Sequence, residues 1–350
     1  MNIYAIIMAG GNGERLWPLS TPKRPKQFVS LFGGKSLIRH AADRIVGLVP
    51  PERVFVITAK RFVGMTRKEL PHIPQENIIG EPCRRDTAAA VAVACGLVKK
   101  YATDDAVGCI LTADQLMTPE AEFKRTLKDA IKSAAGSSSV VTMGIVPDHP
   151  ATGYGYIECG EIVESKTKTR FRRVKRFVEK PDEKTAVKYL KKGGFYWNSG
   201  MFIWRVDSLV RAFSRAAPDI GRLIGMVEKA KSVNALLKQE YSSVRAISFD
   251  YAVMERISDI LVAESSFKWD DVGTWTSVAN HFPADKRNNI CIGRTLLHDV
   301  ADSIVVGDGN HHVMALVGVK DLIVVNNGNT TLICNRNRAQ DIKKIVQRLT

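Results

Sequence analysis

Short apolar segments that alternate with helical patterns run through the first two thirds of the chain, and they restrict the possible folds more than any other feature. The segments are rich in β-branched residues and bounded by turn residues, as buried strands are. We therefore expect an α/β fold with a mostly parallel sheet and helices on both faces, and a ligand site beyond the carboxyl ends of the strands. The expected strands are Tyr4–Met8, Val54–Thr58, Val107–Leu111 and Val140–Ile145, and the expected helices are Ser36–Val46, Arg85–Tyr101 and Ala121–Ala135.

The remainder of the chain has a different pattern. We expect antiparallel strands at Tyr154–Glu158 and Arg173–Phe177, then a helix at Asp182–Lys191, a strand at Ser199–Trp204 and helices within Val206–Gln239.

After His281, short apolar pieces separated by Gly, Asn or Asp predict a small β-solenoid or β-meander domain, which a basic helix at Arg338–Leu349 closes. Of these two forms we expect the solenoid, as a left-handed β-helix-like domain. We expect a large domain at residues 1–280 and this small domain at 281–350. The apolar pieces are Ile290–Ile292, Ser303–Val306, His312–Val317, Leu322–Val325 and Thr331–Cys334.

The formal net charge of +15 favours a polyanionic ligand, for which nucleic acid, an anionic membrane and a nucleoside triphosphate are all candidates. No helix-turn-helix, RNP-like or zinc-finger pattern supports nucleic acid. The densest basic run, Lys166–Lys180, alternates charged with apolar residues, which is typical of strands with one solvated face. We therefore expect neither a nucleic-acid nor a membrane partner.

The cysteines and the apolar segments indicate the cellular compartment of the protein. The six cysteines are scattered singly, with no pairing typical of zinc sites or disulfide frameworks. The apolar stretch Ile3–Met8 is too short for a signal peptide, and no run approaches the ~18 apolar residues of a membrane span. We expect a cytoplasmic protein.

A glycine-rich segment, Ile6–Ser20, carries the strongest chemical signal. A buried strand delivers a loop whose glycines let backbone N–H groups close around a phosphate, and two cations follow. The glycines are Gly10, Gly11 and Gly13, and the cations are Arg15 and Lys26. The spacing fits neither the Rossmann fingerprint nor the Walker A motif. The alternative for the glycine loop is a structural tight turn, and the alternative for Arg15 and Lys26 is a pair of surface salt bridges.

Together with Pro25, these residues resemble the signature of the nucleotide-diphospho-sugar pyrophosphorylases. The resemblance extends over nearly the whole chain through Phe177–Pro181, Tyr196–Phe202 and Trp269–Trp275. The segments Gly80–Ala88 and Ser248–Glu255 are similar to the guanylyltransferase branch in particular. The resemblance implies a GT-A or Rossmann-like nucleotidyltransferase core that transfers GMP from GTP to mannose 1-phosphate, giving GDP-mannose and pyrophosphate. It also implies a homodimer formed through the C-terminal domain.

The chemistry agrees with this motif set. Sugar 1-phosphate is already an ionised nucleophile, so its attack on the α-phosphate needs alignment and neutralisation of charge rather than a strong base. Arg15 and Lys26 are the expected catalytic cations. Asp114 and Asp271 occupy the family's Mg²⁺ positions, with Asp270 as an adjacent competitor and a capping role as the alternative for either.

Base and sugar recognition are assigned to two further groups. The adjacent N1–H and N2–H₂ donors of guanine suit a carboxylate such as Glu81. Arg85, Asp86 and Thr87 follow as nucleotide-binding candidates, although Asp86 or Thr87 would equally suit a helix N-cap. The expected sugar-phosphate residues are Gly155, Glu179, Lys180 and Asn198, and Tyr196, Trp197 and Asp250 either shape that pocket or belong to the core.

Three positions depart from the family pattern: Ala89, Thr112 and Gln115 replace two prolines and a histidine. None of them removes a charged catalytic group, but they leave substrate preference open. The competing functions are another sugar-1-phosphate nucleotidyltransferase, and a non-catalytic subunit that senses a sugar nucleotide.

Overall fold

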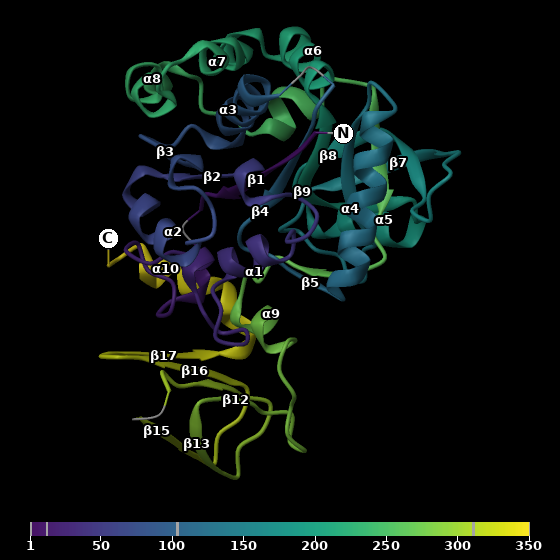
Figure 1. Ribbon diagram of the computed structural model, residues 1–350. Coiled ribbons are helices and arrows are strands. Elements are labelled where there is room, and N and C mark those ends of the chain that lie inside the picture. The colour runs from purple at the N-terminus through teal and green to yellow at the C-terminus, as the bar shows by residue number, and fades with distance from the viewer. Residues whose placement is uncertain (1, 12, 103–104, 310–311, 350) are drawn as a thin grey trace. The chain divides into compact units, whose positions relative to one another are not determined.

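The structure is a computed structural model that describes residues 2–11, 13–102, 105–309 and 312–349 (Figure 1). Asn12 of the glycine-rich segment lies outside the described residues. Packing divides the chain into two compact units. Unit 1 comprises Met1–Gly10, Ala41–Ala113 and Met117–Trp269, and unit 2 comprises Gly11–His40, Asp114–Leu116 and Asp270–Thr350.

A sheet of nine strands, counted over the described residues, forms the centre of unit 1. In sheet order the strands are β3 (Ile78–Glu81), β2 (Val54–Ala59), β1 (Ile3–Ala9), β4 (Val107–Thr112), β9 (Phe195–Arg205), β6 (Val140–Ile145), β10 (Ile260–Glu264), β8 (Phe171–Val178) and β7 (Tyr156–Val163). The four strands expected from the apolar segments are confirmed as β1, β2, β4 and β6. Strands β3 and β10 were not predicted. Two short strands, β5 (Leu116–Thr118) and β11 (Lys268–Asp270), pair with each other.

The central sheet is mixed, so the expectation of a mostly parallel sheet is corrected. Strands β3, β2, β1 and β4 are parallel neighbours, and so are β6 and β10. Strand β9 lies antiparallel between β4 and β6, and β8 lies antiparallel between β10 and β7. Strand β9 is buried along most of its length, as central parallel strands are. Its apolar pattern therefore contained no information about its direction.

Helices cover both faces of this sheet. Helix α3 (Asp86–Tyr101) is buried from Ala88 to Val98 and shares one apolar cluster with α6 (Val206–Ala216), α7 (Pro218–Lys229) and one face of the strands. Helix α4 (Glu120–Ala135) contacts β4, β6, β9 and β10, but its buried residues do not belong to that cluster. The other helices are α1 (Leu37–Asp43), α2 (Val63–Glu69), α5 (Glu183–Lys192) and α8 (Val233–Glu240). In the described part of the chain, no helix has both the length and the hydropathy needed to cross a bilayer.

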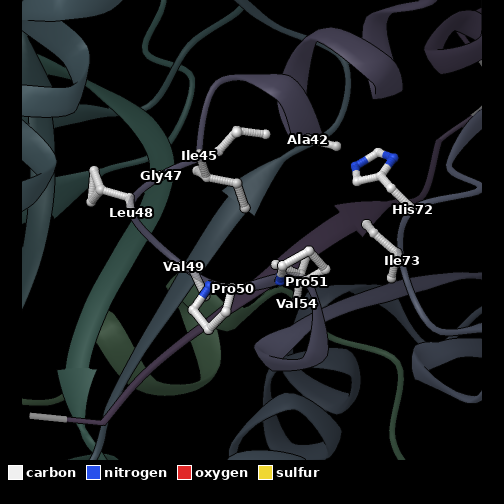
Figure 2. Close-up of a pocket in the computed structure, with 11 residues that line it drawn as sticks. Ala42, Ile45, Gly47, Leu48, Val49, Pro50, Pro51, Val54, His72 and Ile73 are labelled. Atoms are coloured by element: carbon white, nitrogen blue, oxygen red, sulfur yellow. The ribbon is translucent and has the colours of Figure 1, made fainter.

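An apolar cavity of about 390 Å³ lies in unit 1 beside the start of β2 (Figure 2). Its lining comes from Ala42, from residues 45–51, from Val54, and from His72 and Ile73. No acidic residue, lysine or arginine is among the lining residues. Because a triphosphate needs cationic and N–H donors, this cavity does not suit a nucleotide.

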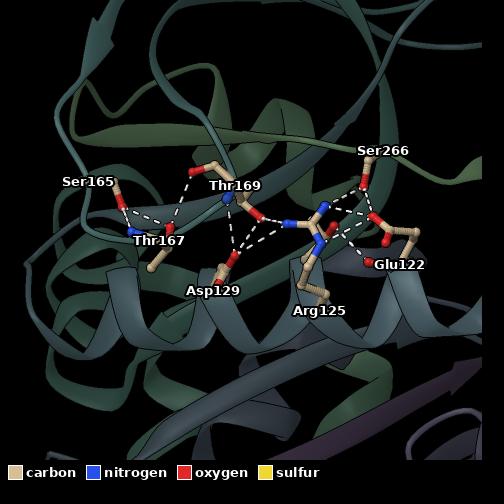
Figure 3. A network of polar contacts seen from close by, with 8 residues as sticks. Glu122, Arg125, Asp129, Ser165, Thr167, Thr169 and Ser266 are labelled. Atoms are coloured by element: carbon tan, nitrogen blue, oxygen red, sulfur yellow. Dashed lines mark hydrogen bonds and ion pairs between the residues drawn. The ribbon is translucent and has the colours of Figure 1, made fainter.

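A polar network holds the connection between β7 and β8 on helix α4 (Figure 3). The guanidinium of Arg125 donates to Glu122 and to the hydroxyl of Thr169, and Asp129 accepts from both the backbone N–H and the hydroxyl of Thr169. Beyond it, Arg172 pairs with Glu264 at 2.5 Å. The predicted strand Arg173–Phe177 is confirmed as part of β8. Burial does not alternate along it, however, because Phe171 and Phe177 are buried while Arg173 and Lys175 on the same face are exposed, so the prediction of one solvated face is not confirmed.

Unit 2 contains the C-terminal strands, which coil between two sheets. Strands β12 (Ile290–Ile292), β14 (Ile304–Val306) and β16 (Leu322–Asn327) are parallel neighbours, and β17 (Thr330–Asn335) is antiparallel to β16. Strands β13 (Arg294–His298) and β15 (Val313–Val317) form the second, parallel sheet. Since the chain alternates between the sheets, the domain is β-helix-like, as expected. Strand β13 was not predicted.

The end of the chain is less helical than predicted. The expected helix Arg338–Leu349 is a 3₁₀ segment at Arg336–Asp341 followed by a short α10 (Ile342–Val346). Arg338 has non-helical dihedral angles, with φ −113° and ψ 17°, so the basic pattern does not continue as one helix.

The core of unit 2 joins segments from both ends of the sequence. Leu16, which follows the glycine loop, and Phe32, which follows Lys26, belong to the same apolar cluster as Ile304 and Ile323 of the C-terminal strands. Helix α9 (Trp275–Ala279) and α10 complete this cluster. The phosphate-binding candidate loop is therefore supported by the C-terminal strands.

Two hydrogen bonds strengthen this packing. The indole N–H of Trp275 donates to the carbonyl oxygen of Trp17 at 3.0 Å, and the amide of Asn327 donates to that of Pro18 at 2.8 Å. Both acceptors lie in the segment between the glycines and Lys26.

Candidate active site

The glycine-rich loop requires glycine for two separate reasons. Gly11 and Gly13 have φ angles of +110° and +59°, in the region that favours glycine. A Cβ on Gly13 would also lie 2.1 Å from the Cβ of Lys26. Gly10, which follows strand β1 in unit 1, has open space around it. The loop thus holds the stem of Lys26 directly against the backbone of Gly13.

Lys26 connects the two predicted metal ligands. Its buried ammonium group donates to Asp114 Oδ2 at 2.9 Å and to the backbone carbonyl oxygen of Asp271. These three residues are 88 and 245 positions apart in the sequence, yet all lie in unit 2. The structure therefore brings together Lys26, the carboxylate of Asp114 and the backbone of Asp271.

Arg15 lies directly after the same loop. Its Nε is buried and has no hydrogen-bond partner among the described residues. Because an unpaired buried donor is costly, the position is suited to an anion that accepts from it.

The neighbouring carboxylates Asp270 and Asp271 have different environments. Asp270 accepts from the backbone N–H of Val272 at 2.7 Å, from the hydroxyl of Ser277, and it pairs with His281 at 2.9 Å. Burial opposes ionisation of Asp270, but the hydrogen bonds from His281 and Ser277 outweigh it and lower its pKa. The carboxylate of Asp271 accepts from the backbone N–H of Gly273 at 3.1 Å, so both carboxylates make contacts within the protein.

The donor set suits Mg²⁺. Hard carboxylate oxygens are its usual protein ligands, and it takes only one or two of them when phosphate oxygens and water complete the octahedron. Asp114 and Asp271 supply two such carboxylates beside one lysine. The described residues contain no group of three or more His, Cys, Asp or Glu that could hold a metal.

The base-binding candidate Glu81 ends strand β3 in unit 1. The hydroxyl of Tyr241, which is fully buried, donates to Glu81 Oε1. Burial raises the pKa of Glu81, while the hydrogen bond from Tyr241 and the charge of Arg84 lower it in part. Sequence reasoning missed Tyr241, because no local pattern links it to Glu81.

Neither Asp86 nor Thr87 caps helix α3. The N-cap position is Arg85, whose side chain makes no cap hydrogen bond but donates from Nε to Ser242 O at 3.1 Å. The hydroxyl of Thr87 accepts from the backbone N–H of Phe249 at 2.8 Å, and Asp86 has a φ of +59°. Positive φ at a residue other than glycine is uncommon and is often found at functional sites.

The four sugar-phosphate candidates lie together in unit 1. Asn198 donates from its backbone N–H to Gly155 O at 2.8 Å, and Glu179 Oε2 lies 2.7 Å from where a Cβ on Gly155 would be. Lys180 Nζ pairs with Glu179 Oε1 at 2.5 Å, which raises the pKa of Lys180. Lys180 has a φ of +42°, a further sign of local strain.

Asp250 joins this group. The side-chain amide of Asn198 donates to Asp250 Oδ1 at 2.7 Å. Burial, with the nearby charge of Glu179, raises the pKa of Asp250 to about 6. Asp250 begins a five-residue π-helix, Asp250–Met254, a form of helix that is rare and frequent at functional sites.

Two aromatic candidates separate into different roles. The ring of Tyr196 belongs to the apolar cluster of unit 1, and its hydroxyl donates to Glu264 at 2.7 Å. The ring of Trp197 lies against Tyr154, with centroids 5.1 Å apart, and Tyr154 lies against Trp269 at 5.0 Å. Tyr154 and Trp197 adjoin Gly155 and Asn198 in the sequence, and Tyr154 and Trp269 were not predicted.

The sequence departures lie at buried positions. Ala89 is a buried residue of helix α3, and the hydroxyl of Thr112 is buried without a hydrogen-bond partner among the described residues. Gln115 is also buried.

Comparison with known proteins assigns this arrangement to a class. Residues 4–288 match the family described as nucleotidyl transferase, and residues 293–349 match the MannoseP isomerase/GMP-like beta-helix domain. The chain belongs to the nucleotidyl transferase family.

Individual relatives are more specific. The mannose-1-phosphate guanylyltransferase of Escherichia coli K12 is 35% identical over 99% of this chain and 73% of its own length. The protein of the same name from Salmonella montevideo is 37% identical over 99% of this chain and 74% of its own. A crystal structure from Thermus thermophilus, described as mannose-1-phosphate geranyltransferase, covers 100% of this chain and 99% of its own, with 33% identity and a TM-score of 0.89.

Proposed function

We propose that the chain transfers GMP from GTP to mannose 1-phosphate and releases pyrophosphate, giving GDP-mannose. The observation that carries the proposal is the position of Lys26, whose ammonium lies between Asp114 and Asp271 beside a glycine loop. Relatives named mannose-1-phosphate guanylyltransferase align with almost the whole chain and support the choice of substrates.

The reaction is an in-line displacement. A phosphate oxygen of mannose 1-phosphate forms a bond to the α-phosphorus of GTP, the bond from that phosphorus to the bridging oxygen breaks, and pyrophosphate leaves with its electron pair. No proton has to be removed from the nucleophile, so positioning and neutralisation of charge supply most of the catalysis.

The loop of unit 2 supplies the catalytic groups. Backbone N–H groups at Gly11 and Gly13 bind the triphosphate, and Arg15 Nε gains a phosphate oxygen as its partner. Lys26 neutralises the charge that develops on the leaving pyrophosphate. We propose Asp114 and Asp271 as the ligands of Mg²⁺, which when bound neutralises phosphate charge and fixes the geometry of the triphosphate.

A second set of residues is proposed to supply specificity. Glu81 accepts from the guanine edge, and Arg85, Asp86 and Thr87 complete the nucleotide-binding residues. Lys180 binds the phosphate of mannose 1-phosphate. Glu179 and Asn198 bind hexose hydroxyls, and Gly155 allows the close approach of the sugar to the backbone. Gly10 connects the strand to the phosphate loop.

Organisation, assembly and location are proposed on separate grounds. We propose a nucleotidyltransferase domain at 1–280 and a left-handed β-helix-like domain at 281–350, following the change in sequence pattern. A homodimer is supported by apolar side chains exposed on the C-terminal strands, Leu296, Val317 and Ile333. The six free cysteines support a cytoplasmic location.

Turnover with defined substrates tests the function. The protein is incubated with Mg²⁺, mannose 1-phosphate and each nucleoside triphosphate in turn, and pyrophosphate release is followed. We expect release with GTP that is reduced at least about a hundredfold in Lys26→Ala and Asp114→Ala. Lys23→Ala, which removes an exposed lysine of the same segment, is the matched control and should retain activity.

The outcomes separate the competing functions. Release with another triphosphate or sugar phosphate would identify a different sugar-1-phosphate nucleotidyltransferase. Absence of release with every pair would favour a non-catalytic subunit that senses a sugar nucleotide.

A further inference from the structure

Tyr241 contacts the base-reading candidate Glu81 from a distant part of the sequence. It lies 160 positions after Glu81, is fully buried, and donates its hydroxyl proton to Glu81 Oε1. Among the described residues, Glu81 Oε2 makes no hydrogen bond. The carboxylate therefore has one oxygen held by the protein and the other available to a ligand.

The segment that carries Tyr241 is fixed on both sides of Glu81. Just before Glu81, the backbone N–H of Gly80 donates to the side-chain carbonyl of Asn234 in α8. Just after it, the guanidinium of Arg85 donates to the backbone carbonyl of Ser242. Since Asn234 and Ser242 bracket Tyr241 in the sequence, three contacts join the two segments in register.

We propose that Tyr241 is a positioning residue that fixes the carboxylate of Glu81 for guanine and so sets the selectivity for GTP. The inference deepens the proposed function and rests on it. Guanine presents two adjacent donors, N1–H and N2–H₂. One can donate to the open Oε2 of the oriented carboxylate, and the other to the lone pair that remains on Oε1 beside the hydrogen bond from Tyr241. Adenine presents an acceptor at N1, and uracil presents a single donor between two acceptors, so each would place an acceptor against a carboxylate oxygen.

An oriented carboxylate discriminates better than a mobile one. A polar site that is built for one hydrogen-bond pattern rejects a ligand that leaves its buried groups unpaired. If the hydroxyl of Tyr241 is removed, Glu81 can rotate to accept from other donors, and the cost of binding the wrong base falls. The effect is expected on the ratio between nucleotides rather than on binding in general.

The same hydroxyl influences when Glu81 carries its charge. The hydrogen bond from Tyr241 lowers the pKa of Glu81, against burial, which raises it, and Arg84 acts in the same direction as Tyr241. Arg85 and Cys83 are the other ionisable groups that face Tyr241. Removing the hydroxyl should therefore raise the pKa of Glu81, so that binding of GTP is lost at a higher pH during acidification.

Tyr241→Phe tests the inference, because it deletes only the hydroxyl. Tyr4→Phe is the matched control: Tyr4 is also buried, and its hydroxyl donates to the carbonyl of Tyr101 at 2.8 Å. GTP, ATP and UTP are titrated calorimetrically into each variant, so the measurement does not depend on turnover. We expect the preference for GTP over ATP to fall about tenfold in Tyr241→Phe and to stay unchanged in Tyr4→Phe.

A double-mutant cycle with Glu81→Gln distinguishes positioning from a structural role. Tyr241→Phe should add nothing to the loss of selectivity in the Glu81→Gln background, and the acid shift should disappear there. Equal weakening of all three nucleotides by Tyr241→Phe would overturn the inference, as would selectivity that remains in the double variant. A preference for GTP that falls in Tyr241→Phe, measured calorimetrically in a protein that releases no pyrophosphate, would refute the proposed reaction while supporting the role of Tyr241.

Discussion

Replacing Gly13 with alanine is expected to impair catalysis far more than it impairs folding. Two effects act at this position: a φ of +59°, and the Cβ of Lys26 at 2.1 Å from the added methyl group. The backbone effect alone costs about 1–2 kcal/mol, because an L-residue resists the left-handed region. The contact adds a displacement of the catalytic lysine.

The size of that displacement follows from the geometry. Ordinary van der Waals contact begins at 3.4 Å, so the stem of Lys26 or the loop has to withdraw by about 1.3 Å. A misplacement of about 1 Å in a catalytic group can lower the rate about a hundredfold, which corresponds to about 2.7 kcal/mol in activation free energy. We expect kcat/KM of Gly13→Ala to fall by about this factor.

Gly33→Ala is the matched control. Gly33 lies in the same unit with a φ of +58°, but an added Cβ would have open space within 4 Å. Both variants should lose about 1–2 kcal/mol in the free energy of unfolding, measured with urea. Only Gly13→Ala should lose the hundredfold in kcat/KM for pyrophosphate release. Equal losses of kcat/KM in the two variants would refute the reasoning, because the contact with Lys26 would then be irrelevant.

Three further perturbations test other parts of the structure. Because burial raises the pKa of Asp250 to about 6, the folded protein binds this proton more tightly than the unfolded chain, and stability is lost as pH rises from about 4 to about 6. Asp250→Asn keeps an acceptor for Asn198, so urea unfolding should show it more stable than wild type by up to about 3 kcal/mol at about pH 7.5 and equal near pH 4; a constant difference would contradict this. Mg²⁺ at about a hundred times its Kd should stabilise the protein by about 2.7 kcal/mol in thermal melts against EDTA, and Asp114→Ala should abolish the gain; a gain of the same size in the variant would exclude Asp114 as a ligand. Asn327→Ala removes the hydrogen bond to Pro18 and should cost about 1 kcal/mol with a several-fold fall in kcat/KM, whereas an unchanged kcat/KM would show that this bond does not position the loop.

Features that depend on a contiguous stretch of sequence could be predicted. The strands β1, β2, β4 and β6 were predicted because short runs of β-branched residues between turn residues are typical of buried strands. The glycine loop, Lys26 and Asp114 were predicted from motifs, and the structure places Lys26 and Asp114 2.9 Å apart. Gly155 and Asn198 likewise lie together.

Features that depend on distant segments could not be predicted. Strand β9 is apolar on both faces whether its neighbours are parallel or antiparallel, so its direction was invisible. Tyr241 reaches Glu81 across 160 residues, and an isolated tyrosine near a helix end has no distinguishing pattern. Asp270 and Asp271 are adjacent and chemically identical, so the contacts of Asp270 with Ser277 and His281 could not be predicted from the sequence.

The shared apolar cluster of Leu16 and Phe32 with Ile304 and Ile323 has an evolutionary consequence. A recombination event that joined the catalytic loop of one relative to the C-terminal strands of another would pair that loop with a foreign packing surface. The parts of the gene that encode these two segments are therefore expected to be under joint selection, although almost 290 residues separate Leu16 from Ile304. Chimeras between relatives should retain activity only when both ends come from the same parent.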